Sequence, residues 1–113
     1  MFKEHSLRPR NFCEDANANI VHSGRNPMCG DALTIYARVE DGVVARLSFT
    51  GVGCAVCLAS MSCLTETVPG CSVADIRSWG VLNIERILGV KIAPLRVPCA
   101  VLGLRIFQEK IDG

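Results

Sequence analysis

The chain has 113 residues, of which 50% are hydrophobic, and a formal net charge of +1. This length predicts a single domain over residues 1–113 with a modest buried core. The Lys and Arg residues are scattered, so the charge pattern gives no basis for binding nucleic acid. We expect no membrane association either, because no apolar run reaches the about 18 residues of a spanning helix. The polar N-terminal sequence does not resemble a signal peptide.

The first half of the chain predicts a β-hairpin that follows a loop. Residues 1–10 are expected to form a short helix, and residues 11–31 a polar loop with one edge strand. Apolar residues alternate with polar ones over residues 32–50, which is typical of paired strands. Asp41-Gly42 interrupts this pattern and favours a tight hairpin turn. We expect one face of the return strand to carry Val43, Ala45, Leu47 and Phe49.

The second half of the chain predicts helices. Helical spacing of apolar residues runs over residues 54–68, a Ser-capped helix is expected over 72–78, and a third over 83–88. Residues 90–98 are expected to be extended because of their prolines, and Pro98 is expected to open a final helix. The order predicts an α+β fold, in which a small antiparallel sheet packs against helices.

Seven cysteines are many for this length, and the odd number without a secretory signal indicates a reducing, cytoplasmic environment. Cys29 lies in a Pro/Gly loop, while Cys54 and Cys99 fall at predicted helix N-termini, which favour an anion. Asp31 follows Cys29 with only Gly30 between them. Three thiolates and one carboxylate suit tetrahedral zinc, and they equally suit an iron–sulfur cluster. The spacing matches no zinc finger.

The other cysteines allow two interpretations. Cys54-x-x-Cys57 has the spacing of a dithiol redox motif, but it lacks the strand–helix context and the aromatic–Gly–Pro surroundings of that motif. We therefore expect Cys57 to pack on a helix face as a small hydrophobe. The same interpretation is expected to hold for Cys13, Cys63 and Cys71.

Four motifs, in this order, resemble the U-type iron–sulfur cluster scaffold family, which includes IscU, SufU and the N-terminal domain of NifU. They are HSLRPRN, NPMCGDALTIY, GVGCAVCLASMS and APLRVPCAVLGL, and they extend from His5 to Leu104. The resemblance implies a SufE/NifU-like scaffold fold. It also implies that a transient [2Fe–2S] cluster is built on four ligands from iron and from the sulfur of a partner cysteine desulfurase, and then passed to apo-proteins. The ligands implied are Cys29, Asp31, Cys54 and Cys99, and zinc binds the same site in this family.

The resemblance leaves three functions open. The leading hypothesis is a cluster scaffold, which is not an enzyme in the turnover sense. The first alternative is a SufU-like, zinc-bound sulfur acceptor, because GVKIAPLRVPCAVLGL looks more like the sulfur-accepting branch; Cys99 or Cys29 would receive the sulfur first. The second alternative is a structural zinc domain, which predicts unfolding when the metal is removed.

Two features depart from the family pattern. The insertion that many members of the sulfur-accepting branch carry between the second and third cysteines is missing, and the residue before the third cysteine differs. Other branches place His or Lys immediately before the third cysteine, whereas this sequence has Pro98. No imidazole is therefore available there as a substitute ligand. IAPLRVPC only partly resembles the motif that a dedicated Hsp70-type chaperone reads, so that chaperone is a doubtful partner.

Overall fold

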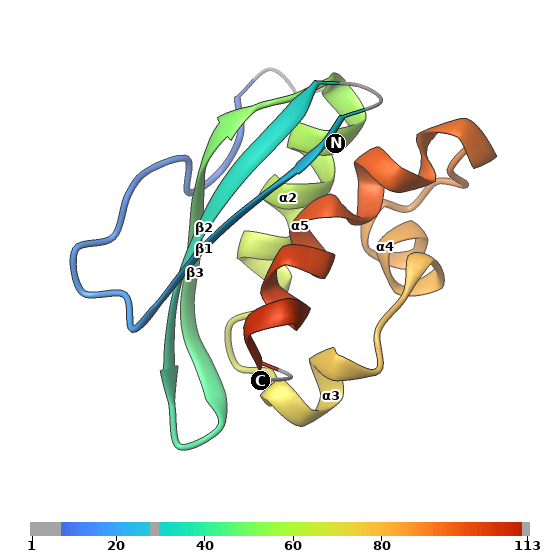
Figure 1. Cartoon of the computed structure of the whole chain (residues 1–113). Helices are drawn as coiled ribbons and strands as arrows, with labels where there is room; N and C mark the ends of the chain where they lie inside the picture. Colours follow the sequence, from blue (N-terminus) through green and yellow to red (C-terminus); the bar gives the residue numbers. More distant parts are fainter. Residues whose placement is uncertain (1–7, 28–29, 112–113) are drawn as a thin grey trace.

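The sheet lies on one side of the molecule and the helices on the other (Figure 1). The computed structural model describes residues 8–27 and 30–111. Within these residues three antiparallel strands form one sheet in the order β1-β2-β3. The strands are β1 (Ile20–Asn26), β2 (Asp31–Glu40) and β3 (Val43–Val52). The predicted α+β class, with a hairpin and an edge strand packed on helices, is confirmed.

The helices follow the sheet in the sequence, and α2 and α5 make most of the contact with it. α5 packs along β1 and α2, while α2 packs against β3 and α4. The described helices are α2 (Ala55–Thr67), α3 (Val73–Arg77), α4 (Val81–Leu88), the 3₁₀ helix η1 (Pro94–Arg96) and α5 (Val97–Ile111).

The turn of the β2–β3 hairpin forms where the sequence places it. Asp41 and Gly42 have φ angles of 53° and 76°, so both adopt the left-handed conformation that this turn needs. The expected facing of β3 is wrong in one respect. A β-bulge shifts the register so that Val44 pairs with Val39 and Arg46 with Arg38, which leaves Ala45 as the extra residue. Val44 is therefore buried, and Val43 and Ala45 are exposed.

The core fills the space between the inner face of the sheet and helices α2 and α5. Its side chains are apolar and almost fully buried, so the hydrophobic effect supplies most of the stability of the fold. The largest contributors include Leu33, Ile35, Leu47, Phe49, Met61, Leu64, Leu104, Ile106 and Phe107.

Three expected boundaries differ from the structure. The third helix begins at Val81, two residues early, because the Asn83 side chain accepts a hydrogen bond from Gly80 N at 2.9 Å and so closes the first turn. Residues 90–98 are not extended throughout. Pro94 begins η1 and α5 begins at Val97, since the fixed φ of proline also suits the first turn of a helix. Of the expected helix over 1–10, residues 1–7 lie outside the described residues and residues 8–10 are not helical.

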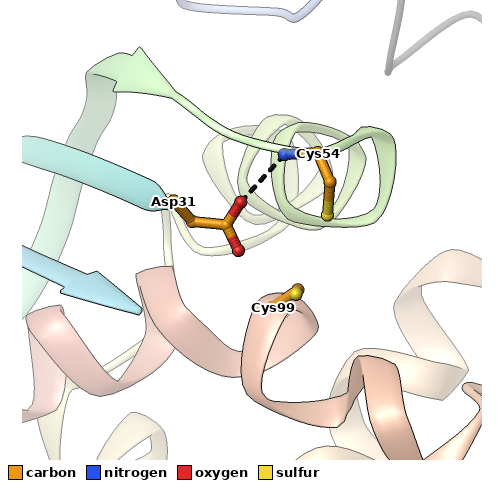
Figure 2. A group of neighbouring side chains, drawn as sticks. All are labelled: Asp31, Cys54 and Cys99. Atoms are coloured by element: carbon orange, nitrogen blue, oxygen red, sulfur yellow. Dashed lines mark hydrogen bonds between the residues drawn. The ribbon is translucent and has the colours of Figure 1, made fainter. Parts of the chain in front are cut away.

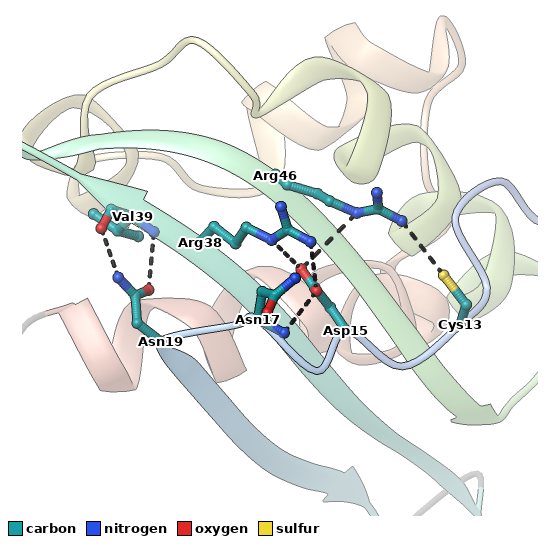
Figure 3. A network of polar contacts seen from close by, with 7 residues as sticks. All are labelled: Cys13, Asp15, Asn17, Asn19, Arg38, Val39 and Arg46. Carbon is teal, nitrogen blue, oxygen red and sulfur yellow. Dashed lines mark hydrogen bonds and ion pairs between the residues drawn. The ribbon is translucent and has the colours of Figure 1, made fainter.

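A polar cluster holds the segment before β1 on the solvent face of the sheet (Figure 3). Arg38 donates two hydrogen bonds of 2.7 Å to the Asp15 carboxylate, and this pairing holds the pKa of Asp15 below its ordinary value. Arg46 lies 3.9 Å from the same carboxylate and donates to Cys13 Sγ at 3.7 Å. The expected burial of Cys13 is wrong, because this thiol lies on the exposed outer face.

Candidate metal centre

The first residues of β2, α2 and α5 meet at one end of the domain (Figure 2). Asp31 is the first residue of β2, Cys54 immediately precedes α2, and Cys99 lies in the first turn of α5. One ligand atom from each residue lies within 4.8 Å of the other two. The structure thus brings together three of the four predicted ligands. The fourth, Cys29, lies outside the described residues.

The two carboxylate oxygens of Asp31 have different surroundings. The residue is 0% exposed, and Oδ1 accepts a hydrogen bond of 2.9 Å from the backbone N–H of Cys54. Oδ2 is also buried, but it has no hydrogen-bond partner among the residues that the structure describes. A buried carboxylate oxygen without a partner is destabilising, whereas a bound cation would satisfy it. The position of Oδ2 therefore fits a metal ligand.

The loop ahead of Cys54 comes unusually close to this carboxylate. A Cβ atom placed on Gly53 would lie 3.2 Å from Asp31 Oδ1 and 2.8 Å from Cys57 Sγ. Glycine therefore allows the chain to enter α2 beside Asp31. Cys54 is the N-cap residue of α2, with extended backbone angles (φ −71°, ψ 171°). The partial positive charge at this end of the helix favours a thiolate or another anion.

Cys99 is 1% exposed, and its sulfur has a polar neighbour that the sequence analysis did not identify. Asn26 Nδ2 donates a hydrogen bond to Cys99 Sγ at a distance of 3.6 Å. Asn26 is the last residue of β1, pairs with Asp31 across the sheet and is 7% exposed. Hydrogen bonds to ligand sulfurs tune metal and cluster sites. Asn26 is the first residue of the NPMCGDALTIY motif, and this position is the sequence signal that could have identified it.

Three further cysteines were expected to be buried in the core. Cys57 and Cys63 are 1% and 3% exposed, as expected, whereas Cys71 is only partly buried. Burial raises the pKa of the Cys63 thiol, which keeps it in the protonated form. Cys63 lies in the later part of α2 and is buried in the hydrophobic core, whereas Cys57 lies in the first turn of α2, beside the site.

The described residues contain no helix with the length and apolarity needed to cross a membrane.

Comparison with known proteins gives a consistent family match. The family described as NifU-like N terminal domain matches residues 2–112. The iron-sulfur cluster assembly scaffold protein IscU of Thermotoga maritima is 32% identical over 111 residues, covering 84% of this chain and 78% of the relative. The zinc-dependent sulfurtransferase SufU of Bacillus subtilis is 26% identical over 125 residues, covering 96% of this chain and 84% of the relative.

A solved structure has the same fold. The N-terminal part of a nitrogen-fixing NifU-like protein from Brucella abortus superposes with a TM-score of 0.81, covering 98% of this chain and 89% of that chain. Its sequence is 18% identical, so this likeness concerns the fold alone.

Proposed function

We propose that this chain, which belongs to the NifU-like N-terminal domain family, is a scaffold on which an iron–sulfur cluster is assembled. It would accept sulfur from a cysteine desulfurase, hold a transient [2Fe–2S] cluster as cargo and transfer that cluster to apo-proteins. Such a protein delivers a product without catalysing turnover. The observation that carries the proposal is the convergence of Asp31, Cys54 and Cys99, in which a buried carboxylate oxygen lacks a partner among the described residues.

The residues of the site fit this role. Two thiols and one carboxylate oxygen already lie together, and Cys29 would complete a set of four ligands. Oxygen is a harder ligand than sulfur and holds iron less firmly than a thiolate does. A scaffold that must release its cluster benefits from one such ligand. Because Asp31 also caps the backbone N–H of Cys54, movement of its carboxylate is coupled to the start of α2.

A second candidate function is a zinc-bound sulfur acceptor. Zn–S bonds of about 2.3 Å in a tetrahedron separate two sulfur ligands by roughly 3.8 Å. The ligand atoms of Asp31, Cys54 and Cys99 lie within 4.8 Å of one another, so a single ion needs only a small contraction of the site. Zinc, when bound, would keep the thiols as thiolates. We propose Cys99 and Cys29 as the first sulfur acceptors.

The metal content of the anaerobically purified chain tests both candidates. Iron with inorganic sulfide and visible absorption supports the scaffold, and one colourless zinc ion per chain supports the acceptor. Cys54→Ser should lose either metal, and the matched control Cys63→Ser, in the same helix, should keep it. Full metal content in Cys54→Ser would overturn both candidates. Unfolding on chelation, followed by circular dichroism, would instead support a structural zinc domain.

A further inference from the structure

Cys57 is a second thiol in the first turn of α2, and the proposed ligand set does not use it. Cys54 is the N-cap residue, so Cys57 occupies the third helical position. In a capping box, the side chain at each of these two positions reaches the backbone N–H of the other, so both positions lie on the same side of the first turn. The Cys54-x-x-Cys57 pair therefore places two thiols one helical turn apart at the edge of the site.

The local packing brings Cys57 close to the carboxylate as well. A Cβ atom placed on Gly53 would lie 2.8 Å from Cys57 Sγ and 3.2 Å from Asp31 Oδ1. The thiol and the buried carboxylate therefore lie on either side of a space about the size of one methyl group. Cys54 O accepts a hydrogen bond of 3.0 Å from Leu58 N–H, so Cys54 lies on the first turn of the helix. A rise of about 1.5 Å per residue and a radius of about 2.3 Å place Cα atoms three residues apart about 5 Å from each other. A disulfide needs Cα atoms about 4.4–6.8 Å apart and Cβ atoms about 3.5–4.5 Å apart, so Cys54 and Cys57 can be bridged when their Cβ atoms move closer together.

Sulfur can reach Cys54 from Cys99, one of the two first acceptors proposed above. Cys99 Sγ lies within 4.8 Å of Cys54 Sγ. A persulfide on Cys99 can therefore pass its outer sulfur to the Cys54 thiolate. That exchange regenerates the Cys99 thiolate and leaves a persulfide on Cys54.

We propose that Cys57 is the resolving thiol that releases this sulfur as sulfide, a role that rests on the sulfur-accepting function proposed above. The Cys57 thiolate, after its proton has passed to water, attacks the inner sulfur of the Cys54 persulfide. A Cys54–Cys57 disulfide forms, the bond between the two persulfide sulfurs breaks, and HS⁻ leaves with the electron pair of that bond. Attack on the outer sulfur moves the persulfide to Cys57, from which Cys54 closes the same disulfide.

The electrons balance within the chain. The outer persulfide sulfur gains two electrons and becomes sulfide, and the two cysteine sulfurs lose two electrons as they form the disulfide. A dithiol reductant is then needed only to reopen the disulfide for the next cycle. The step converts sulfane sulfur, the form that a persulfide carries, into sulfide, the form that a [2Fe–2S] cluster contains. It does so beside Asp31, Cys54 and Cys99, where the cluster would be built.

A single-turnover experiment with glutathione persulfide tests this role. The full-length chain is kept anaerobic without other reductant, mixed with one equivalent of glutathione persulfide, alkylated, and analysed by peptide mass spectrometry and a sulfide assay. Wild type should form the Cys54–Cys57 disulfide and release sulfide above the background of the reagent. Cys57→Ser and Cys57→Ala should lose that release and keep one added sulfur atom on Cys54 or Cys99. Cys63→Ser, another buried thiol of α2, should behave as wild type.

Each outcome is decisive. If wild type keeps its persulfide as long as both Cys57 variants do, the resolving role is wrong, while sulfur acceptance stands. An equal loss of sulfide release in Cys63→Ser also overturns the role, because the effect would not be specific to Cys57. If no variant takes up sulfur at all, the proposed sulfur-accepting function fails, and the role of Cys57 fails with it.

Discussion

Replacing Asp31 with Asn should stabilise the metal-free protein and weaken metal binding. Asp31 is 0% exposed, and its Oδ2 atom has no hydrogen-bond partner among the described residues. An unsatisfied buried polar group costs about 1–3 kcal/mol. In Asp31→Asn the amide oxygen can still accept from Cys54 N–H. The substitution removes the negative charge, and the new NH₂ group can donate to the nearby thiol sulfurs. We expect a gain of about 1–2 kcal/mol in the free energy of unfolding without metal.

Metal binding should change in the opposite direction, because the variant lacks an anionic ligand. Loss of an outer-shell partner already weakens a metal site by about 10–100-fold, so loss of Asp31 as a ligand should reduce zinc affinity by more than about tenfold. Urea unfolding with a chelator and with excess zinc measures both effects. The Asp31→Ala control should be less stable than Asp31→Asn by about 1 kcal/mol, because Cys54 N–H loses its acceptor. An Asp31→Asn protein less stable than wild type without metal would refute this reasoning.

Three further predictions concern two other residues of the candidate metal centre and the polar cluster around Asp15. Anaerobic reconstitution should give no cluster in Cys54→Ser and a full yield in Cys63→Ser; equal yields would contradict the ligand assignment. Asn26→Ala should weaken zinc binding by about 10–100-fold, as measured by competition with a chelator, because the α5 thiol loses its N–H donor. The folded-state pKa of Asp15 is depressed, so its stabilising effect should be present above pH about 4 and disappear as the pH falls further. The difference in unfolding free energy between wild type and Asp15→Asn should thus be larger at pH 7 than at pH 3, and a constant difference would contradict the prediction.

Local rules were enough to predict the hairpin and the main helices, because their signals lie in neighbouring residues. Asp41-Gly42 specifies its own turn, and the apolar spacing after Cys54 specifies α2. The facing of β3 could not be predicted in this way. The bulge at Ala45 depends on how Val44 and Arg46 pair with β2, and that pairing is a property of two strands. A prediction from strict alternation therefore placed Val43 and Ala45 on the buried face, although both are exposed.

The candidate site, too, was predictable from local sequence only in part. Cys54 and Cys99 were predicted from helix boundaries, which single segments reveal. The cap that Asp31 provides to Cys54 N–H joins residues 23 apart in the sequence, and the contact from Asn26 to Cys99 joins residues 73 apart. Neither contact follows from a local pattern. Together they require the end of β1 and the beginnings of β2, α2 and α5 to meet at one end of the fold.

The placement of the ligands at the ends of elements explains how this fold could give up its cargo without unfolding. Most of the core lies between the sheet and the middle of α2 and α5, although the proposed ligand Cys99 also belongs to it. The proposed ligands occupy the first residue of a strand, an N-cap and a first helical turn. The ends of helices and strands generally open more easily than their middles. Helix N-termini offset the negative charge of the thiolates while the site is filled. When cargo leaves, the Oδ2 atom of Asp31 again lacks a partner among the described residues, and this favours renewed binding of a cation.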